Sequence, residues 1–356
     1  MNNKWSLSYI VCVAAALVMS AACLARPAFT EDSAIVYTSC DSIRLAATLA
    51  LPDDGRQQHP AVVLMSGTGP QDRDCTMAGH RLFRDISDFL AARGIAVLRT
   101  DDRGVGQSTG NYSLATTADF AADALAAVSY LKSRADIDPR NIGLVGHSEG
   151  GASISIATAQ SDDVAFMVSL CGLMTAGLPS VIQQNRDIIA ATPLPEADKR
   201  CYDDINERMF RTAFQYADSD SLEEELQRTY DAWHADTTNQ HIRFSIYMYT
   251  MTATSPWYRF FIRYNPADYL SKVHVPVLLV NGGKDVMVNA AQNTDSALRC
   301  LSHNRDVTVR LFPDLTHLLL PCKLGTQEEY RQLADVNTSQ EVLQLLDMWI
   351  HQHLHE

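Results

Sequence analysis

A serine stands between two glycines in the segment GHSEG, residues 146–150, directly after the apolar run 142–145. Glycine lets neighbouring chain segments approach closely, and a sharp turn from a strand into a helix forces its central residue into an unfavourable backbone conformation. The N–H groups and the positive dipole end of the helix that follows would face the serine. The spacing therefore predicts that Ser148 is a nucleophile whose hydroxyl stands clear of its own backbone.

A serine hydroxyl is a weak nucleophile at neutral pH, so it needs a base, and the base needs an orienting acid. Both are expected at the ends of later strands, in the order serine, acid, histidine. The apolar run 275–280 leads into a turn that carries Asp285, and the run 307–312 is followed by His317. We predict Asp285 as the acid and His317 as the base. Asp314 is a rival acid, but it lies so close to the histidine in sequence that we expect it to be a turn residue.

Structural roles for the same residues stay open. Asp285 could be a solvated turn carboxylate, and His317 could be a histidine of the core. His147 adjoins the serine in sequence. Adjacency alone does not create hydrogen-bond geometry, so we expect His147 to be structural.

The tetrahedral intermediate of acyl transfer needs N–H donors for its oxyanion. One donor is expected to be the N–H of Glu149, the residue after the serine. The other is expected from the glycine-bearing loop 66–70, which follows the apolar run 61–65. We choose the N–H of Thr68, with a plain turn as the alternative interpretation of this loop.

Short apolar runs alternate with helical patterns in residues 34–175 and again in residues 266–356. Such alternation predicts an α/β fold with a mostly parallel sheet covered by helices on both faces. Residues 176–265 are polar, acidic and aromatic, with helical spacing and no good strand. Because a loop of that length without its own structure is improbable, we predict a helical cap inserted into one α/β core.

Several local boundaries can also be predicted. Residues 43–51 are expected to form one arm of an early hairpin. Gly94 is placed to end a helix, and Thr116 or Thr117 can cap the start of the next one. The residues of 138–141, DPRN, are typical of a turn.

Residues 1–25 have the features of a secretory signal peptide. Lys4 supplies a positive charge, and the apolar run 9–25 is short for a membrane span. Small residues favour cleavage after Ala25. The segment before Cys23 also resembles a lipoprotein signal that lacks the usual leucine. We expect export to the periplasm or the medium, with a lipid anchor at Cys23 or an uncleaved membrane anchor as alternatives.

Composition restricts the partners. The 356 residues are 46% hydrophobic and 20% charged, as in an ordinary globular protein, and the formal net charge is −13. A phosphate backbone would be repelled, so nucleic acid is not an expected partner. The eight cysteines include no CxxC pair, which argues against a zinc site. No metal or cofactor is implied. An oxidising compartment would allow one or two disulfides, which the sequence cannot pair, whereas Cys171, in an apolar run, is expected to be a buried free thiol.

Three motifs together resemble an α/β-hydrolase: residues 66–74 (SGTGPQDRD), 101–108 (DDRGVGQS) and 146–151 (GHSEGG). They are similar to those of a group of exported bacterial hydrolases near the dienelactone hydrolases and the prolyl-oligopeptidase-like catalytic domains. The resemblance implies a serine esterase with Ser148, Asp285 and His317 as its triad and a helical cap between the sixth and seventh strands. Thr68 stands where many relatives have serine, which changes little if the backbone is the donor.

The motif 101–108 follows an apolar run and therefore lies at the same edge of the sheet as the serine. We expect its charged residues to brace the site, with Arg103 tied to a carboxylate, rather than to contact substrate.

The expected function is hydrolysis of a small-molecule carboxylic ester through an acyl-enzyme at Ser148. The aromatic residues of the insertion would pack its own core or line an apolar acyl pocket. A peptidase or amidase with the same triad is the alternative, and a non-catalytic binding protein on a hydrolase scaffold is a third hypothesis.

Overall fold

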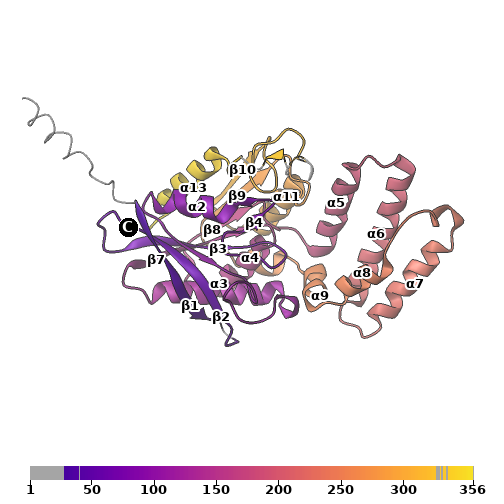
Figure 1. Cartoon of the computed structure of the whole chain (residues 1–356), viewed down its shortest axis with the longest axis horizontal. Coiled ribbons are helices and arrows are strands. Elements are labelled where there is room, and N and C mark those ends of the chain that lie inside the picture. The colour runs from indigo at the N-terminus through magenta and orange to yellow at the C-terminus, as the bar shows by residue number, and fades with distance from the viewer. Residues whose placement is uncertain (1–27, 40, 326–328, 330–331, 334–335, 356) are drawn as a thin grey trace, which may run out of the picture.

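The computed structural model describes residues 28–355 except 40, 326–328, 330–331 and 334–335. The predicted signal peptide, with Cys23, lies outside the described residues. Figure 1 shows two parts, a sheet flanked by helices and a lobe of helices beside it. No helix in the described part of the chain is long and apolar enough to cross a membrane.

The main sheet has eight strands in the order β1-β2-β6-β3-β7-β8-β9-β10. The first two pairings, β1 with β2 and β2 with β6, are antiparallel, and the others are parallel. The central strands are nearly continuous apolar runs, as expected where helices cover both faces. The strands are β1 (Phe29–Thr38), β2 (Arg44–Pro52), β3 (His59–Met65), β6 (Ala96–Thr100), β7 (Ile137–His147), β8 (Met167–Leu170), β9 (Val277–Gly282) and β10 (Val307–Phe312), with β4 (Thr76–Met77) and β5 (His80–Arg81) paired separately.

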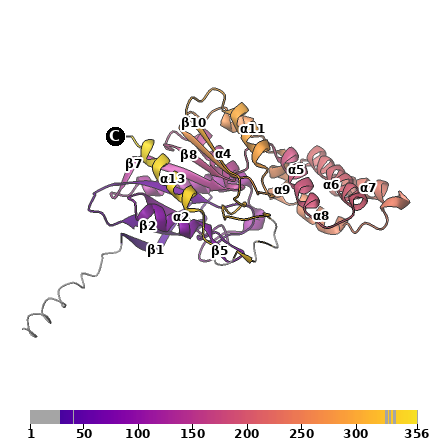
Figure 2. The same cartoon turned by 90° about the horizontal axis from the view of Figure 1, so that it is seen from above.

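Helices cover both faces of this sheet, which confirms the predicted fold class (Figure 2). On one face, α2 (Leu82–Ala91) packs beside α13 (Gln340–Gln352) over one buried apolar cluster. On the other face lie α3 (Thr117–Lys132), α4 (Gly150–Gln160) and α11 (Ala290–Cys300), with the short α10 (Ala267–Leu270) against α4 and α11. The sheet therefore separates two apolar cores.

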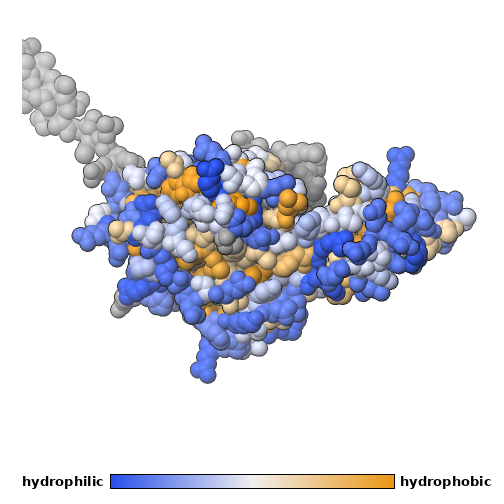
Figure 3. Space-filling view, turned by 90° about the horizontal axis from the view of Figure 1, so that it is seen from below, coloured by the Kyte–Doolittle hydropathy of each residue, from blue (hydrophilic) through white to orange (hydrophobic). Residues whose placement is uncertain are grey.

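Residues 177–263 form the helical lobe, which follows β8 and precedes β9, the sixth and seventh strands of the main sheet in chain order. On the face in Figure 3 the lobe is coloured mainly as hydrophilic, whereas apolar colour gathers on the larger body. The lobe's helices are α5 (Gly177–Ala190), α6 (Glu196–Tyr216), α7 (Leu222–His234), α8 (Ile246–Ala253) and α9 (Pro256–Arg263); the 3₁₀ turns are η1 (Tyr112–Leu114) in the body and η2 (Thr237–Asn239) in the lobe.

Local signals placed several boundaries correctly. All but the first residue of the predicted arm 43–51 fall in β2, which pairs antiparallel with β1 as the hairpin prediction requires. Thr116 is the N-cap of α3 and forms a capping box with Asp119. Gly94 follows α2 with a φ of +90°, a conformation that favours glycine.

The predicted turn at residues 138–141 is wrong, because this segment is extended within β7. Hydrogen bonds typical of a turn are nevertheless present: Asp138 accepts the backbone N–H of Arg140 and the side-chain amide N–H of Asn141. The register against β3 shifts here, since His59 pairs with Ile137 but Ala61 pairs with Ile142. The extra residues are accommodated as a bulge in the strand rather than as a reversal of the chain.

The prediction that Arg103 is tied to a carboxylate is confirmed. Its guanidinium is 4% exposed and donates to Asp123 at 2.7 and 2.8 Å and to Asp41 at 2.7 Å. Asp123 lies on α3, so the pair fastens the loop after β6 to that helix. A buried charge needs such partners because burial alone strongly disfavours it.

Replacing Asp123 by alanine should leave the buried Arg103 with only part of its neutralising charge. We expect Asp123→Ala to lower the free energy of unfolding by about 3 kcal/mol. The exposed pair of Lys132 and Asp163 is a matched control, and Asp163→Ala should cost less than about 1 kcal/mol. Denaturant unfolding of the three proteins measures both effects, and similar losses in the two variants would contradict the buried brace.

Candidate active site

The turn from β7 into α4 places Ser148 in a strained backbone conformation. Its φ is 57°, in the left-handed region that residues other than glycine rarely adopt. A Cβ on Gly146 would lie 2.2 Å from the carbonyl oxygen of Gly150, so no side chain fits there. The predicted sharp strand-to-helix turn is confirmed.

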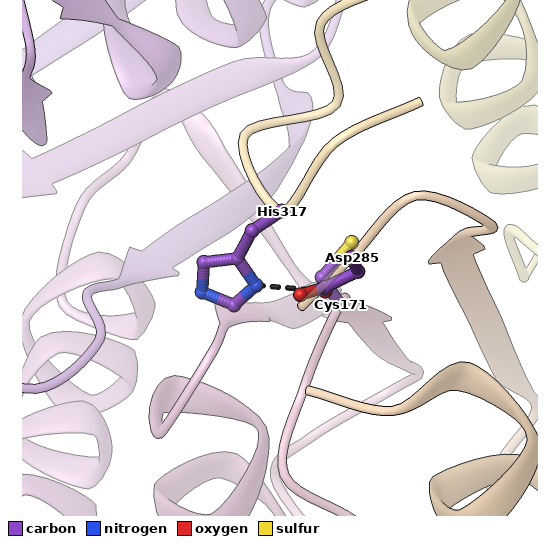
Figure 4. Close-up of side chains that lie close together, drawn as sticks. All are labelled: Cys171, Asp285 and His317. Carbon is purple, nitrogen blue, oxygen red and sulfur yellow. Dashed lines mark hydrogen bonds and ion pairs between the residues drawn. The ribbon is translucent and has the colours of Figure 1, made fainter. Parts of the chain in front are cut away.

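Asp285 and His317 are joined by a hydrogen bond in the buried interior. His317 Nδ1 lies 2.8 Å from Asp285 Oδ2, the dashed line in Figure 4. The other carboxylate oxygen accepts the backbone N–H groups of Met287 and Val288, each at 2.8 Å. With Nδ1–H donating to the carboxylate, Nε2 of the neutral ring is the nitrogen that can accept a proton.

Ser148 and His317 line the same cavity, which has a volume of about 670 Å³ and lies between the sheet and the helical lobe. The His317 ring is bound to Asp285, whereas the backbone carbonyl of the rival acid Asp314 accepts the N–H of Cys322. The structure thus brings the three candidate residues to one edge of the sheet, while their catalytic roles stay predictions.

His147 is fully buried and supports the backbone of His317. Its Nε2–H donates to the His317 carbonyl oxygen at 2.8 Å, and the two ring centroids are 4.6 Å apart. Burial lowers the pKa of His147 to about 3, so this ring is neutral at ordinary pH. The contact fits the structural role expected from sequence.

Cys171 is buried beside the Asp285–His317 pair (Figure 4). It is a free thiol, as are the four other cysteines in the described part of the chain. One ligand atom from each of Cys171, Asp285 and His317 lies within 4.8 Å of the others. A metal there would have to displace the hydrogen bond between Asp285 and His317, and the expectation that no metal is needed stays a prediction.

The loop after β3 passes directly against Ser148. A Cβ on Gly67 would lie only 2.7 Å from the Ser148 Cβ. Thr68 and Glu149 both line the cavity that holds the serine. Within the described residues, no hydrogen-bond acceptor is found for the backbone N–H of either residue. Both groups can therefore donate to a bound oxyanion.

Two residues that sequence reasoning did not single out brace this loop. Asp102 accepts the hydroxyl of Ser66 at 2.7 Å and the N–H of Gln71 at 2.8 Å, so it fixes both ends of the loop. The hydroxyl oxygen of Tyr112 accepts the N–H of Gly69 at 2.7 Å. The position of Asp102 in the motif after β6 was a signal that it lies near the site, but Tyr112 gave none.

The side chain of Glu149 is also engaged, although sequence reasoning considered only its N–H. One oxygen accepts the Thr68 hydroxyl at 2.7 Å. The other accepts the Thr117 hydroxyl at 2.6 Å and the indole N–H of Trp257 at 2.8 Å. These donors come from the loop after β3, from α3 and from helix α9 of the lobe.

The cavity wall is mostly apolar. Among the described residues that line it, none is a lysine or an arginine, and Glu149 is the one carboxylate. Its apolar wall comes largely from the lobe and from the loop before α11, with Val181, Ile188, Phe210, Trp257, Phe261 and Met287 among its members.

Comparisons with known proteins find related sequences and similar folds. The sequence profile of the X-Pro dipeptidyl-peptidase (S15) family matches residues 41–310. Esterase EstD of Thermotoga maritima is 25% identical over 284 residues, which are 80% of this chain. The matched region spans 60% of the length of that relative.

Solved structures show the same fold at low sequence identity. The α/β-hydrolase GrgF from Penicillium sp. sh18 superposes with a TM-score of 0.55 at 17% identity, over 91% of this chain and 98% of that one. The esterase Pf2001 of Pyrococcus furiosus gives a TM-score of 0.54 at 15% identity, over 99% and 95%. The chain has the α/β-hydrolase fold, as the sequence motifs implied.

The partly buried carboxyl of Asp102, which holds both ends of the loop 66–70, leads to a prediction about pH. Burial raises its pKa to about 7, although the hydrogen bonds from Ser66 and Gln71 lower it. In the unfolded chain the carboxyl loses its proton near pH 4. Its contribution to stability is therefore full below about pH 4 and is lost as the pH rises to about 7.

Asp102→Asn replaces this group with a permanently neutral one of the same shape. Relative to the wild type, the variant should gain about 1 kcal/mol of stability per pH unit between pH 4 and 7, and the difference should be constant above pH 7. Unfolding measured at several pH values tests this. A difference that does not change with pH would contradict it.

Proposed function

The chain belongs to the X-Pro dipeptidyl-peptidase (S15) family, and we propose that it is a serine hydrolase that cleaves a carboxylic ester through an acyl-enzyme. The observation that carries the proposal is that His317, hydrogen-bonded to Asp285, lines the same cavity as a serine in a strained turn. Strained conformations of this kind persist only where the surrounding structure enforces them, and they cluster at active sites.

The reaction follows from these positions. Ser148 Oγ attacks the ester carbonyl carbon while its proton passes to His317 Nε2. The N–H groups of Thr68 and Glu149 donate hydrogen bonds to the carbonyl oxygen as it becomes negatively charged. The intermediate collapses, the C–O bond breaks, and the alcohol leaves with the proton from His317. Water then attacks the acyl-enzyme with His317 as base, releasing the acid and the free serine. Asp285 orients the ring and stabilises its protonated form.

The cavity supports an uncharged substrate with an apolar acyl group. Its wall is mostly apolar, and no cationic side chain among the described lining residues could pair with an anionic substrate. A volume of about 670 Å³ fits a small molecule. In this proposal the helical lobe acts as a cap that excludes water from the acyl group.

The match to the X-Pro dipeptidyl-peptidase family makes peptide cleavage the second candidate function. A free X-Pro dipeptidyl group carries an ammonium group, which needs an acidic partner when it is bound. In the described part of the cavity wall that partner would be Glu149, whose carboxylate already accepts three hydrogen bonds. This occupancy and the relative named as an esterase favour the ester as substrate.

Turnover of p-nitrophenyl esters of increasing acyl length tests the proposal. We expect Ser148→Ala to abolish hydrolysis and Asp285→Asn to lower kcat by about 10³–10⁴-fold. Asp314→Asn is the matched control, because it changes the rival acid, and it should retain activity. The wild type should prefer a chain that fills the apolar cavity.

The alternatives give different results in the same assays. Turnover of X-Pro p-nitroanilides without turnover of any ester would replace the proposal by the peptidase. Ligand binding by folded protein without turnover of either class would support a binding protein. Equal losses in Asp285→Asn and Asp314→Asn would contradict the assignment of the acid.

We further propose that the chain is exported, on the support of the positive start and apolar run in residues 1–25. Expressed in a Gram-negative host, the mature protein should begin at Arg26 and appear in the periplasm or the medium. A variant without residues 2–25 should stay inside the cell. A mature chain that begins at a lipid-modified Cys23 would support the anchored alternative, and an intact N-terminus would contradict cleavage.

A further inference from the structure

We propose that the side chain of Glu149 is a positioning residue that holds the two oxyanion donors at their working separation and makes that separation depend on helix α9 of the lobe. The inference rests on the proposed ester hydrolysis. It concerns the carboxylate of Glu149, which is distinct from the backbone N–H that the mechanism uses.

The first step is the direct bond between the two donor residues. The Thr68 hydroxyl donates to the Glu149 carboxylate, so the residues that supply the two N–H groups are fastened to each other. Thr68 stands between Gly67 and Gly69, whose backbones have little conformational preference of their own. Because oxyanion donors act within about 2.7–3.1 Å of the oxygen, this side-chain bond can decide whether the Thr68 N–H is in range.

The second step is the link to the lobe. Trp257 lies on α9, which packs against α5 and α6 within the lobe. The indole ring of Trp257 stacks on the Phe261 ring, with the two centroids 5.1 Å apart. An indole N–H can only donate, so its bond to Glu149 has a fixed direction. A displacement of α9 would therefore pull on the same carboxylate that holds Thr68.

The third step concerns charge. Glu149 is 3% exposed, and its three donors, Thr68, Thr117 and Trp257, are all neutral. Burial raises the pKa of Glu149 despite these bonds. A neutral glutamine can keep the arrangement, because its carbonyl oxygen can accept from Thr117 and Trp257 and its N–H can donate to the Thr68 hydroxyl. Alanine can keep none of these contacts.

Steady-state kinetics of Glu149→Gln and Glu149→Ala on the preferred p-nitrophenyl ester tests the positioning role. We expect Glu149→Ala to lower kcat by about 10²-fold, the size of losing one oxyanion donor, with KM changed by less than about 3-fold. Glu149→Gln should stay within about 10-fold of the wild-type kcat. Wild-type kcat in the alanine variant, or equal losses in both variants, would overturn the proposal.

The link to the lobe is tested by combining Thr68→Val with Trp257→Phe. This pair also tests the proposal if Glu149→Ala fails to fold. Both residues act through Glu149, so each single change should lower kcat by about 10-fold and the pair should lower it little further. Trp233→Phe is the matched control in the lobe, because its indole N–H has no partner among the described residues, and it should leave kcat unchanged.

The outcomes distinguish a failure of this inference from a failure of the proposed ester hydrolysis. Losses that multiply in the double variant, or a Trp257→Phe that changes KM alone, would show that Trp257 is only part of the cavity wall and would overturn the link. An active wild type with unaffected variants overturns the inference and leaves ester hydrolysis standing. A wild type without ester turnover overturns both.

Discussion

The positive φ of Ser148 is the constraint from which the rest of the site is built. A conformation of this kind costs on the order of 1–3 kcal/mol and must be held by its surroundings. The Ser148 N–H donates to the Leu170 carbonyl oxygen, and the Ser148 carbonyl oxygen accepts the N–H of Leu173. Strand β8 and the chain after it therefore hold the turn from one side. On the other side, a Cβ on Gly150 would lie 2.3 Å from the Met65 carbonyl oxygen at the end of β3. The turn therefore forms only where three neighbouring strands end together.

The same edge of the sheet fixes the Asp285–His317 pair. Asp285 follows β9 and His317 follows β10, and these neighbouring parallel strands end side by side. Backbone N–H groups hold one oxygen of the Asp285 carboxylate, and the His147 side chain holds the His317 backbone, so both members of the pair are fixed from outside the cavity-lining lobe.

Sequence predicts the parts of this arrangement that depend on local order. The strained serine and the capped helix at Thr116 follow from neighbouring residues, and the edge of the sheet follows from the alternation of strands and helices. The partners of Glu149 do not, because they are 81, 32 and 108 residues away in the chain and no local pattern pairs them. The error at residues 138–141 has a similar origin, since a register shift against β3 decided between a turn and a bulge.

Four acids near the loop 66–70 differ in whether a cationic side chain pairs with them, and this difference sets the electrostatics of the loop. Asp101 and Asp123 are paired with Arg73 and Arg103, and neither acid lines the cavity that holds the serine. Asp102 and Glu149, on the two sides of the loop, accept hydrogen bonds only from neutral donors among the described residues, and each lies in a site where burial raises its pKa. A full negative charge on either group would oppose the developing oxyanion. Because an adjacent arginine would favour the ionised form of either carboxyl, neutral donors are the better partners for ordering the loop at this site.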